Sequence, residues 1–116
     1  MTNQAATEQG TEKLLIKHGV GGRTFVDSSQ DPEIQYRVEP DGEGWLFTIG
    51  IAPSSAVVQI LEWRQELNVF LFRDYPNRPT VKCWYYVLNG PVEYHRDREE
   101  LVIRADSRIE YVPDEF

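Results

Sequence analysis

The feature that most constrains this chain is a two-residue alternation of apolar and polar side chains, broken by turn-forming residues. Apolar side chains occupy every second position over residues 34–38 and again over residues 45–51. The intervening segment 40–44 is Pro-Asp-Gly-Glu-Gly, in which proline fixes one φ angle and glycine permits a positive one. Period two is the repeat of a half-buried strand, so we predict an antiparallel hairpin here.

The rest of the chain continues this pattern. Short connections favour antiparallel neighbours, so we expect successive strands to pair, including residues 92–96 back onto 80–88. Residues 75–79 contain two prolines, which cannot donate to a strand ladder, and a turn is expected there. The further predicted strands cover residues 14–16, 23–27, 68–74, 80–88, 92–96, 101–105 and 108–112.

One segment has helical spacing instead. Ser54 or Ser55 can cap a helix, and apolar residues recur at intervals of three and four up to Leu67. The predicted fold class is therefore α+β. It consists of a mostly antiparallel, strongly bent sheet or partial barrel of about seven to eight strands, with one helix near residues 54–67.

The length of 116 residues accommodates one domain. Residues 1–12 are polar and without periodicity, which predicts a disordered tail, followed by a single α+β domain over 13–112 and a flexible C-terminal tail at 113–116. No apolar run is long enough to span a bilayer, and the N-terminus lacks a leader pattern. With Cys83 as the single cysteine, we expect a cytoplasmic protein without membrane contact.

No set of residues indicates catalysis. The glycine-rich segment 18–24 lacks the spacing of a phosphate loop and is interpreted as a connector. Glu93, His95 and Asp97 share one face of a strand, a conceivable metal set, but a solvated outer face is the favoured interpretation of so charged a stretch. We therefore predict no catalytic residues, no metal and no cofactor, and a non-enzymatic protein is favoured over an enzyme.

Charge and aromatic residues are unevenly placed. The net charge of −7 argues against direct binding of nucleic acid, which needs a basic surface. Acidic residues are concentrated over residues 27–43, where Arg37 is the only base. Trp84 and Tyr86 share one strand face with Lys82, and such rings favour interfaces because they are apolar with one polar end.

These features predict a protein–protein interaction module of the acidic inhibitor or immunity type, whose partner is basic or handles nucleic acid. A nucleic-acid mimic is a narrower version of this hypothesis. One alternative is a small-ligand-binding or catalytic β-barrel-like domain, with Tyr85 or Trp84 in a pocket on which an arginine or His95 converges. Another is a subunit of a homo-oligomer, such as a homodimer. The predicted partner-binding residues are Asp27, Asp31, Glu33, Glu39, Asp41, Glu43, Trp84 and Tyr86.

Overall fold

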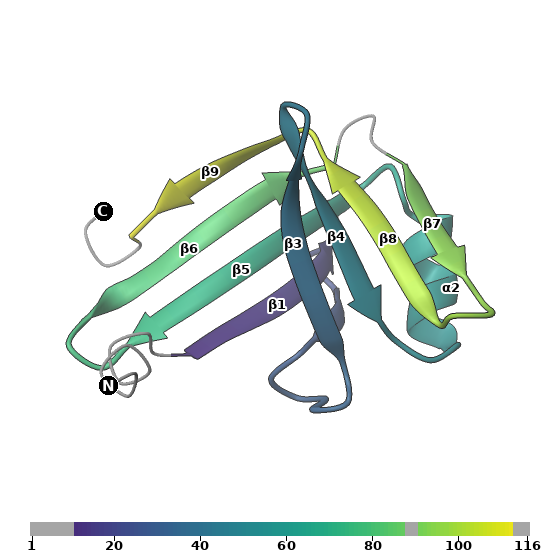
Figure 1. Cartoon of the computed structure of the whole chain (residues 1–116), viewed down its shortest axis with the longest axis horizontal. Helices are drawn as coiled ribbons and strands as arrows, with labels where there is room; N and C mark the ends of the chain where they lie inside the picture. The colour runs from purple at the N-terminus through teal and green to yellow at the C-terminus, as the bar shows by residue number, and fades with distance from the viewer. Residues whose placement is uncertain (1–10, 88–90, 113–116) are drawn as a thin grey trace.

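The computed structural model describes residues 11–87 and 91–112, which form two antiparallel sheets and one helix (Figure 1). Residues 1–10 and 113–116, which make up most of the predicted tails, lie outside the described residues. Thr11 and Glu12, which the sequence assigned to the N-terminal tail, belong to the first strand.

All strand pairs within the two sheets are antiparallel, as the short connections indicated. The five-stranded sheet has the order β2-β1-β5-β6-β9, and the four-stranded sheet has the order β3-β4-β8-β7. The first comprises β1 (Thr11–His18), β2 (Thr24–Asp27), β5 (Leu67–Tyr75), β6 (Arg78–Tyr86) and β9 (Ser107–Tyr111). The second comprises β3 (Gln35–Asp41), β4 (Gly44–Gly50), β7 (Val92–His95) and β8 (Glu100–Ala105).

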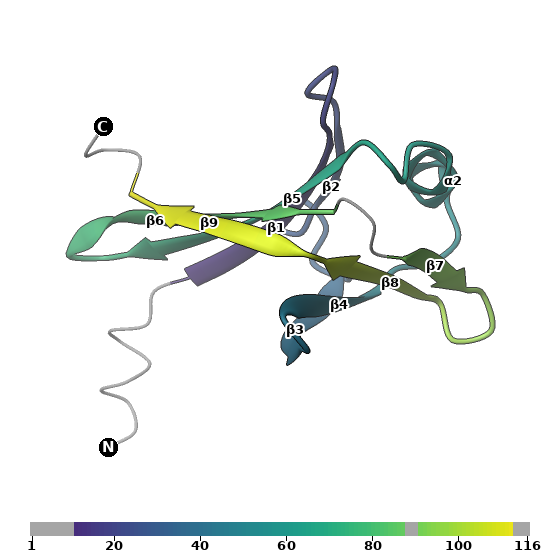
Figure 2. The ribbon, with the colours of Figure 1, turned by 90° about the horizontal axis from the view of Figure 1, so that it is seen from above.

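The predicted α+β class with mostly antiparallel sheet and one helix is confirmed, but the bending into a partial barrel is not, because the described strands form two sheets that do not close. The described residues contain nine strands, against the expected seven to eight. The expected pairing of residues 92–96 with 80–88 is also wrong, since β7 pairs with β8. The chain changes sheet at Asp106, between β8 and β9, where the Asp106 N–H donates to the Tyr86 carbonyl over 2.9 Å (Figure 2).

Two hairpins show how local sequence sets the turns. Asp41 pairs with Gly44 across a two-residue loop, and Gly42 has a φ of 63°, which is typical of a type II′ turn and confirms the predicted hairpin. The turn expected over 75–79 is tighter than predicted, because Tyr75 pairs with Arg78 and Pro79 lies inside β6. A register irregularity after Arg73 accommodates the proline.

The predicted helix is present but shorter than expected. Helix α2 (Ser55–Glu62) begins at Ser54, whose side chain accepts a hydrogen bond from the Val57 N–H. Leu67 fits helical spacing but is buried as the first residue of β5, so the helix does not reach it. The helix packs against β2 and β7 at one end of the molecule (Figure 2). In the described part of the chain, no helix has the length and apolar character needed to cross a bilayer.

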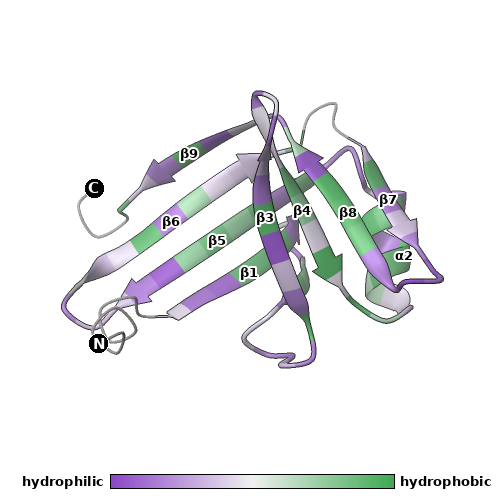
Figure 3. Cartoon of the chain, viewed as in Figure 1, coloured by the Kyte–Doolittle hydropathy of each residue, from purple (hydrophilic) through white to green (hydrophobic). Residues whose placement is uncertain are grey.

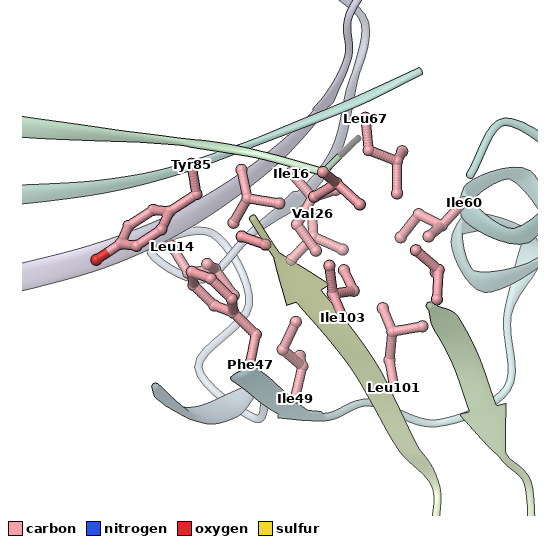
Figure 4. Close-up of a cluster of buried hydrophobic side chains, with 14 of the residues drawn as sticks. Leu14, Ile16, Val26, Phe47, Ile49, Ile60, Leu67, Tyr85, Leu101 and Ile103 are labelled. Carbon is pink, nitrogen blue, oxygen red and sulfur yellow. The ribbon is translucent and has the colours of Figure 1, made fainter. Parts of the chain in front are cut away.

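The hydrophobic core lies between the two sheets (Figure 4). Apolar positions of β4, β5 and β8 supply much of it, and they appear as green bands in Figure 3. Ile60 of the helix closes one end. The labelled side chains of Figure 4 are Leu14, Ile16, Val26, Phe47, Ile49, Ile60, Leu67, Tyr85, Leu101 and Ile103, all at most 3% exposed.

Candidate functional site

Large aromatic side chains and lysines share the outer face of the five-stranded sheet. Residues paired across neighbouring strands share a face, and the alternate positions of these strands point into the core. The outer face therefore carries three rows across β1, β5, β6 and β9. They are Lys13, Phe72, Lys82 and Tyr111, then Leu15, Phe70, Trp84 and Ile109, then Lys17, Asn68, Tyr86 and Ser107. We call these twelve residues the aromatic–lysine face.

The aromatic rings of this face contact one another in tilted pairs and contact lysine. The Trp84 ring centroid lies 5.6 Å from that of Phe70 and 4.8 Å from that of Tyr86. Lys82 Nζ lies 4.6 Å from the Phe70 ring centroid and 5.2 Å from that of Phe72. Ammonium groups held over ring faces at these distances make cation–π contacts, which fix the lysine heads against the apolar surface.

All three lysines of the chain, Lys13, Lys17 and Lys82, lie on this face. Within residues 11–87 and 91–112, no carboxylate lies within 4.0 Å of any of their ammonium groups. By contrast, Arg73 and Arg104 each contact a carboxylate at 3.0 Å or less. The face is thus locally positive on a protein of net charge −7, with Asp27 of β2, which pairs with Leu15 and attracts Lys13, as the acidic residue at its edge.

The outer side of β6 and β9 is not covered by any other described element. No labelled helix or strand lies against it in Figure 2, and the Ile109 side chain is 47% exposed. The Trp84 Nε1–H is buried among its neighbours and has no hydrogen-bond partner among the described residues. A buried donor without an acceptor is uncommon in folded proteins.

The structure brings Trp84 and Tyr86 together with Lys82, on one face as the alternation indicated. Their role in partner binding stays a prediction. Alternation along the sequence did not predict that residues of β1, β5 and β9 belong to this surface. Alternation within residues 68–74 already places Phe70 and Phe72 on one side of a strand, but only the strand order sets them beside Trp84.

The six predicted acidic residues do not form one surface. Three of them, Asp27, Asp31 and Glu33, line a cavity of about 680 Å³ near the start of α2, together with Glu99. The others lie at or beyond the opposite end of β3, about 20 Å away for a seven-residue strand. Two of these are already paired: Asp41 Oδ2 lies 3.0 Å from Arg104 Nε, and Glu39 lies 3.7 Å from Arg37.

The acidic cavity near α2 is partly organised by its own loop. Asp27 Oδ1 accepts hydrogen bonds from the Ser29 N–H at 2.9 Å and the Ser29 hydroxyl at 2.6 Å. The hydroxyl bond is the main cause that lowers the pKa of Asp27, so this carboxylate is charged at neutral pH. Four carboxylates against Arg98 give the cavity an excess of negative charge, which suits a basic side chain.

The remaining titratable groups form no metal centre. Glu93 Oε1 lies 3.7 Å from His95 Nε2 on the outward side of β7, whereas Asp97 lies in the turn before β8. Across the described ranges, no three His, Cys, Asp or Glu side chains are grouped so that they could hold a metal ion. The segment between β1 and β2 is a hairpin connection closed by the His18 N–H, which donates to the Arg23 carbonyl over 2.8 Å.

Cys83 is fully buried on the inner face of β6. Its Sγ donates to Glu110 Oε2 over 3.5 Å. Burial and the neighbouring Glu110 carboxylate raise the pKa of the thiol, so the protonated form is held at neutral pH. This is the environment of a structural cysteine.

Comparison with known proteins identifies no relative: the chain matches no protein-family model, no curated protein and no solved structure.

Proposed function

We propose that this domain is a protein-interaction module that binds an acidic, partly apolar segment of a partner protein through its aromatic–lysine face. The observation that carries the proposal is the gathering of all three lysines on one face with buried and half-buried rings, without a carboxylate within 4.0 Å in the described chain. The narrower class predicted from the sequence, an acidic inhibitor or immunity protein, stays a prediction.

Charge complementarity defines the partner. Lys82 and Lys13 hold their ammonium groups over aromatic rings, where an approaching carboxylate gains an ion pair without having to displace an existing one. Ile109 on the edge strand β9 and the ring edges beside it supply apolar area for an interface. A segment that alternates acidic and apolar side chains satisfies both features.

Two other kinds of binding partner fit the aromatic–lysine face less well. A single-stranded nucleic acid needs open ring faces for base stacking, but Lys82 and neighbouring rings already occupy the face of Phe70. A second copy packed symmetrically through this face would set lysines against lysines. The net charge of −7 also disfavours a nucleic-acid backbone.

The chemistry of the partner can be tested by selecting short random peptides displayed on phage against the full chain. We expect the selected peptides to be enriched in Asp and Glu together with Leu, Phe or Tyr. Selection against the double variant Lys13→Glu, Lys82→Glu should lose the acidic enrichment, because the two ammonium groups that attract it are reversed. The control variant Arg23→Glu and Arg64→Glu changes the charge equally at positions away from this face and should select the original peptides.

Peptides without acidic enrichment, or with the same enrichment on both double variants, would reject the proposal. Oligothymidylate that binds the chain more tightly than the selected peptides would assign the face to nucleic acid. Light scattering that detects a dimer lost in the Lys13→Glu, Lys82→Glu variant would assign it to a second copy.

The acidic cavity near α2 supports a second surface, suited to the basic partner predicted from the sequence. Here the test compares Asp31→Asn, Glu33→Gln with Glu39→Gln, Glu43→Gln, which remove the same charge at opposite ends of β3. A lysine-rich peptide should bind the first variant several-fold more weakly than wild type and the second with little change. Equal weakening in both variants would show a general charge effect and no cavity.

A further inference from the structure

The five-stranded sheet extends beyond β3, so part of its inner face is not covered by the four-stranded sheet (Figure 1). A pocket of about 310 Å³ lies where the two sheets separate. Strands β3 and β4 supply one wall, and β1, β5, β6 and β9 supply the other. The side chains that carry the argument are Tyr36, Val38, Trp45, Leu71, Tyr85 and Arg108.

The one acidic side chain that lines this pocket is already engaged. Glu12 Oε1 accepts from the Tyr36 hydroxyl at 2.8 Å, and Glu12 Oε2 accepts from Arg73 Nε at 2.8 Å. Burial and the bond to Glu12 raise the pKa of Tyr36, so its hydroxyl stays a donor. Glu110 contacts Cys83 and Arg73, and its charge also acts on Arg108 without contacting it.

Arg108 is the cation in the pocket without a carboxylate partner. In the described part of the chain, no carboxylate lies within 4.0 Å of its guanidinium. The guanidinium carbon lies 4.8 Å from the Trp45 ring centroid and 5.9 Å from that of Tyr85, and Nη1 donates to the Tyr85 hydroxyl over 3.2 Å. Tyr85 is itself fixed in the core, at 1% exposure, with its ring 5.7 Å from Trp45.

A guanidinium stacked on a tryptophan keeps its N–H donors in a fixed plane, the geometry that matches a carboxylate. We propose that the pocket binds a small organic acid, with its carboxylate on Arg108 and its apolar body against Val38 and Leu71. The volume is at the lower end of the range of about 300–1,000 Å³ for small-molecule sites. The site faces the inner side of β6 and β9 and is therefore independent of the aromatic–lysine face.

The experiment uses benzoate as the carboxylate probe and benzamide as its neutral counterpart of the same shape. Arginine Nε–H and tryptophan Nε1–H resonances are followed in ¹H–¹⁵N spectra of the full chain during each titration. We expect saturable shifts of the Arg108 and Trp45 signals with benzoate. Benzamide should bind at least about tenfold more weakly, because it lacks the charge that pairs with the guanidinium.

Three variants locate the site. Arg108→Gln should weaken benzoate at least about tenfold, and Arg108→Lys should weaken it to an intermediate extent because charge is kept but the planar fork is lost. Arg23→Gln removes an arginine outside the pocket and should bind as wild type does. Unchanged thermal unfolding in Arg108→Lys separates loss of the site from loss of the fold.

The proposal is rejected if benzamide binds as tightly as benzoate, or if Arg108→Gln leaves benzoate affinity unchanged. Inorganic phosphate that binds more tightly than benzoate would identify a bare anion site and reject the organic acid. Peptide binding to the aromatic–lysine face is measured separately, and its success or failure does not change these outcomes.

Discussion

At the scale of single residues, the environment of Cys83 determines its chemistry. The thiol is fully buried, and burial together with the Glu110 carboxylate raises its pKa, so little thiolate exists at neutral pH. We expect the native protein to react with Ellman's reagent at least about a hundredfold more slowly than the unfolded chain, since both access and ionisation are reduced. Glu110→Gln should increase the native rate, and Glu43→Gln, the same change in the β3–β4 turn, should not. A native rate close to the unfolded rate would contradict this description.

Trp84 and Tyr85 are adjacent in sequence, but the polar atoms of their side chains differ in hydrogen bonding. Trp84 Nε1–H is buried without an acceptor in the described residues, whereas the Tyr85 hydroxyl accepts from Arg108. Replacing Trp84 by Phe removes an unsatisfied donor that costs about 1–3 kcal/mol, which offsets much of the lost packing. We therefore expect Trp84→Phe to lower the free energy of unfolding by less than about 1 kcal/mol in urea titrations.

The matched variant is Tyr85→Phe, which removes one polar atom from the neighbouring ring and leaves the Arg108 donor without its acceptor. It should lose about 1 kcal/mol, the usual net value of a satisfied hydrogen bond. A larger loss in Trp84→Phe than in Tyr85→Phe would mean that the indole N–H has an acceptor in solution.

At the scale of elements, the β3–β4 hairpin depends on Gly44. A Cβ atom at this position would collide with the Ala105 carbonyl of β8, which lies directly against it. Gly44→Ala should therefore destabilise the protein by about 1–3 kcal/mol, as overpacking does in tightly packed sites. Thermal and urea unfolding measure the effect. Gly21→Ala, where only a His18 side-chain atom lies near the added methyl group, should change stability by less than about 0.5 kcal/mol. Equal changes in the free energy of unfolding for the two variants would show that the backbone around Gly44 adjusts to the added methyl group without loss of stability.

The elements also show which parts of the fold could be predicted. Alternation and turn residues correctly located the hairpin at residues 40–44, because both signals are local. The helix was predicted to extend to Leu67 because an apolar residue at this position fits both helical and strand periodicity. In the structure, Leu67 is buried as the first residue of β5. The change of sheet at Asp106 was missed, since a one-residue link between two strands resembles a hairpin turn until long-range pairing is known.

At the scale of the whole molecule, the arrangement of the two sheets creates both candidate surfaces. Placing β1, β5, β6 and β9 side by side turns scattered lysines and rings into one face, and the offset between sheets opens the Arg108 pocket. Sequence periodicity correctly predicted that Trp84 and Tyr86 lie on one face of their strand. The order of the strands depends on pairing between segments that are distant in sequence, so periodicity could not predict it. The acidic residues over 27–43 illustrate the converse: they are neighbours in sequence, and β3 separates them into two groups.

The central claim, that the aromatic–lysine face binds the partner, is tested most directly by the calorimetric affinity of a selected acidic peptide for two matched variants. Ile109→Ser and Val58→Ser each remove one exposed apolar side chain, 47% and 62% exposed, but only Ile109 lies on the face. The predicted result is at least about tenfold weaker binding to Ile109→Ser, as expected for an exposed apolar side chain that the partner buries, and wild-type affinity for Val58→Ser. Wild-type affinity for Ile109→Ser, or equal losses in both variants, would contradict the account.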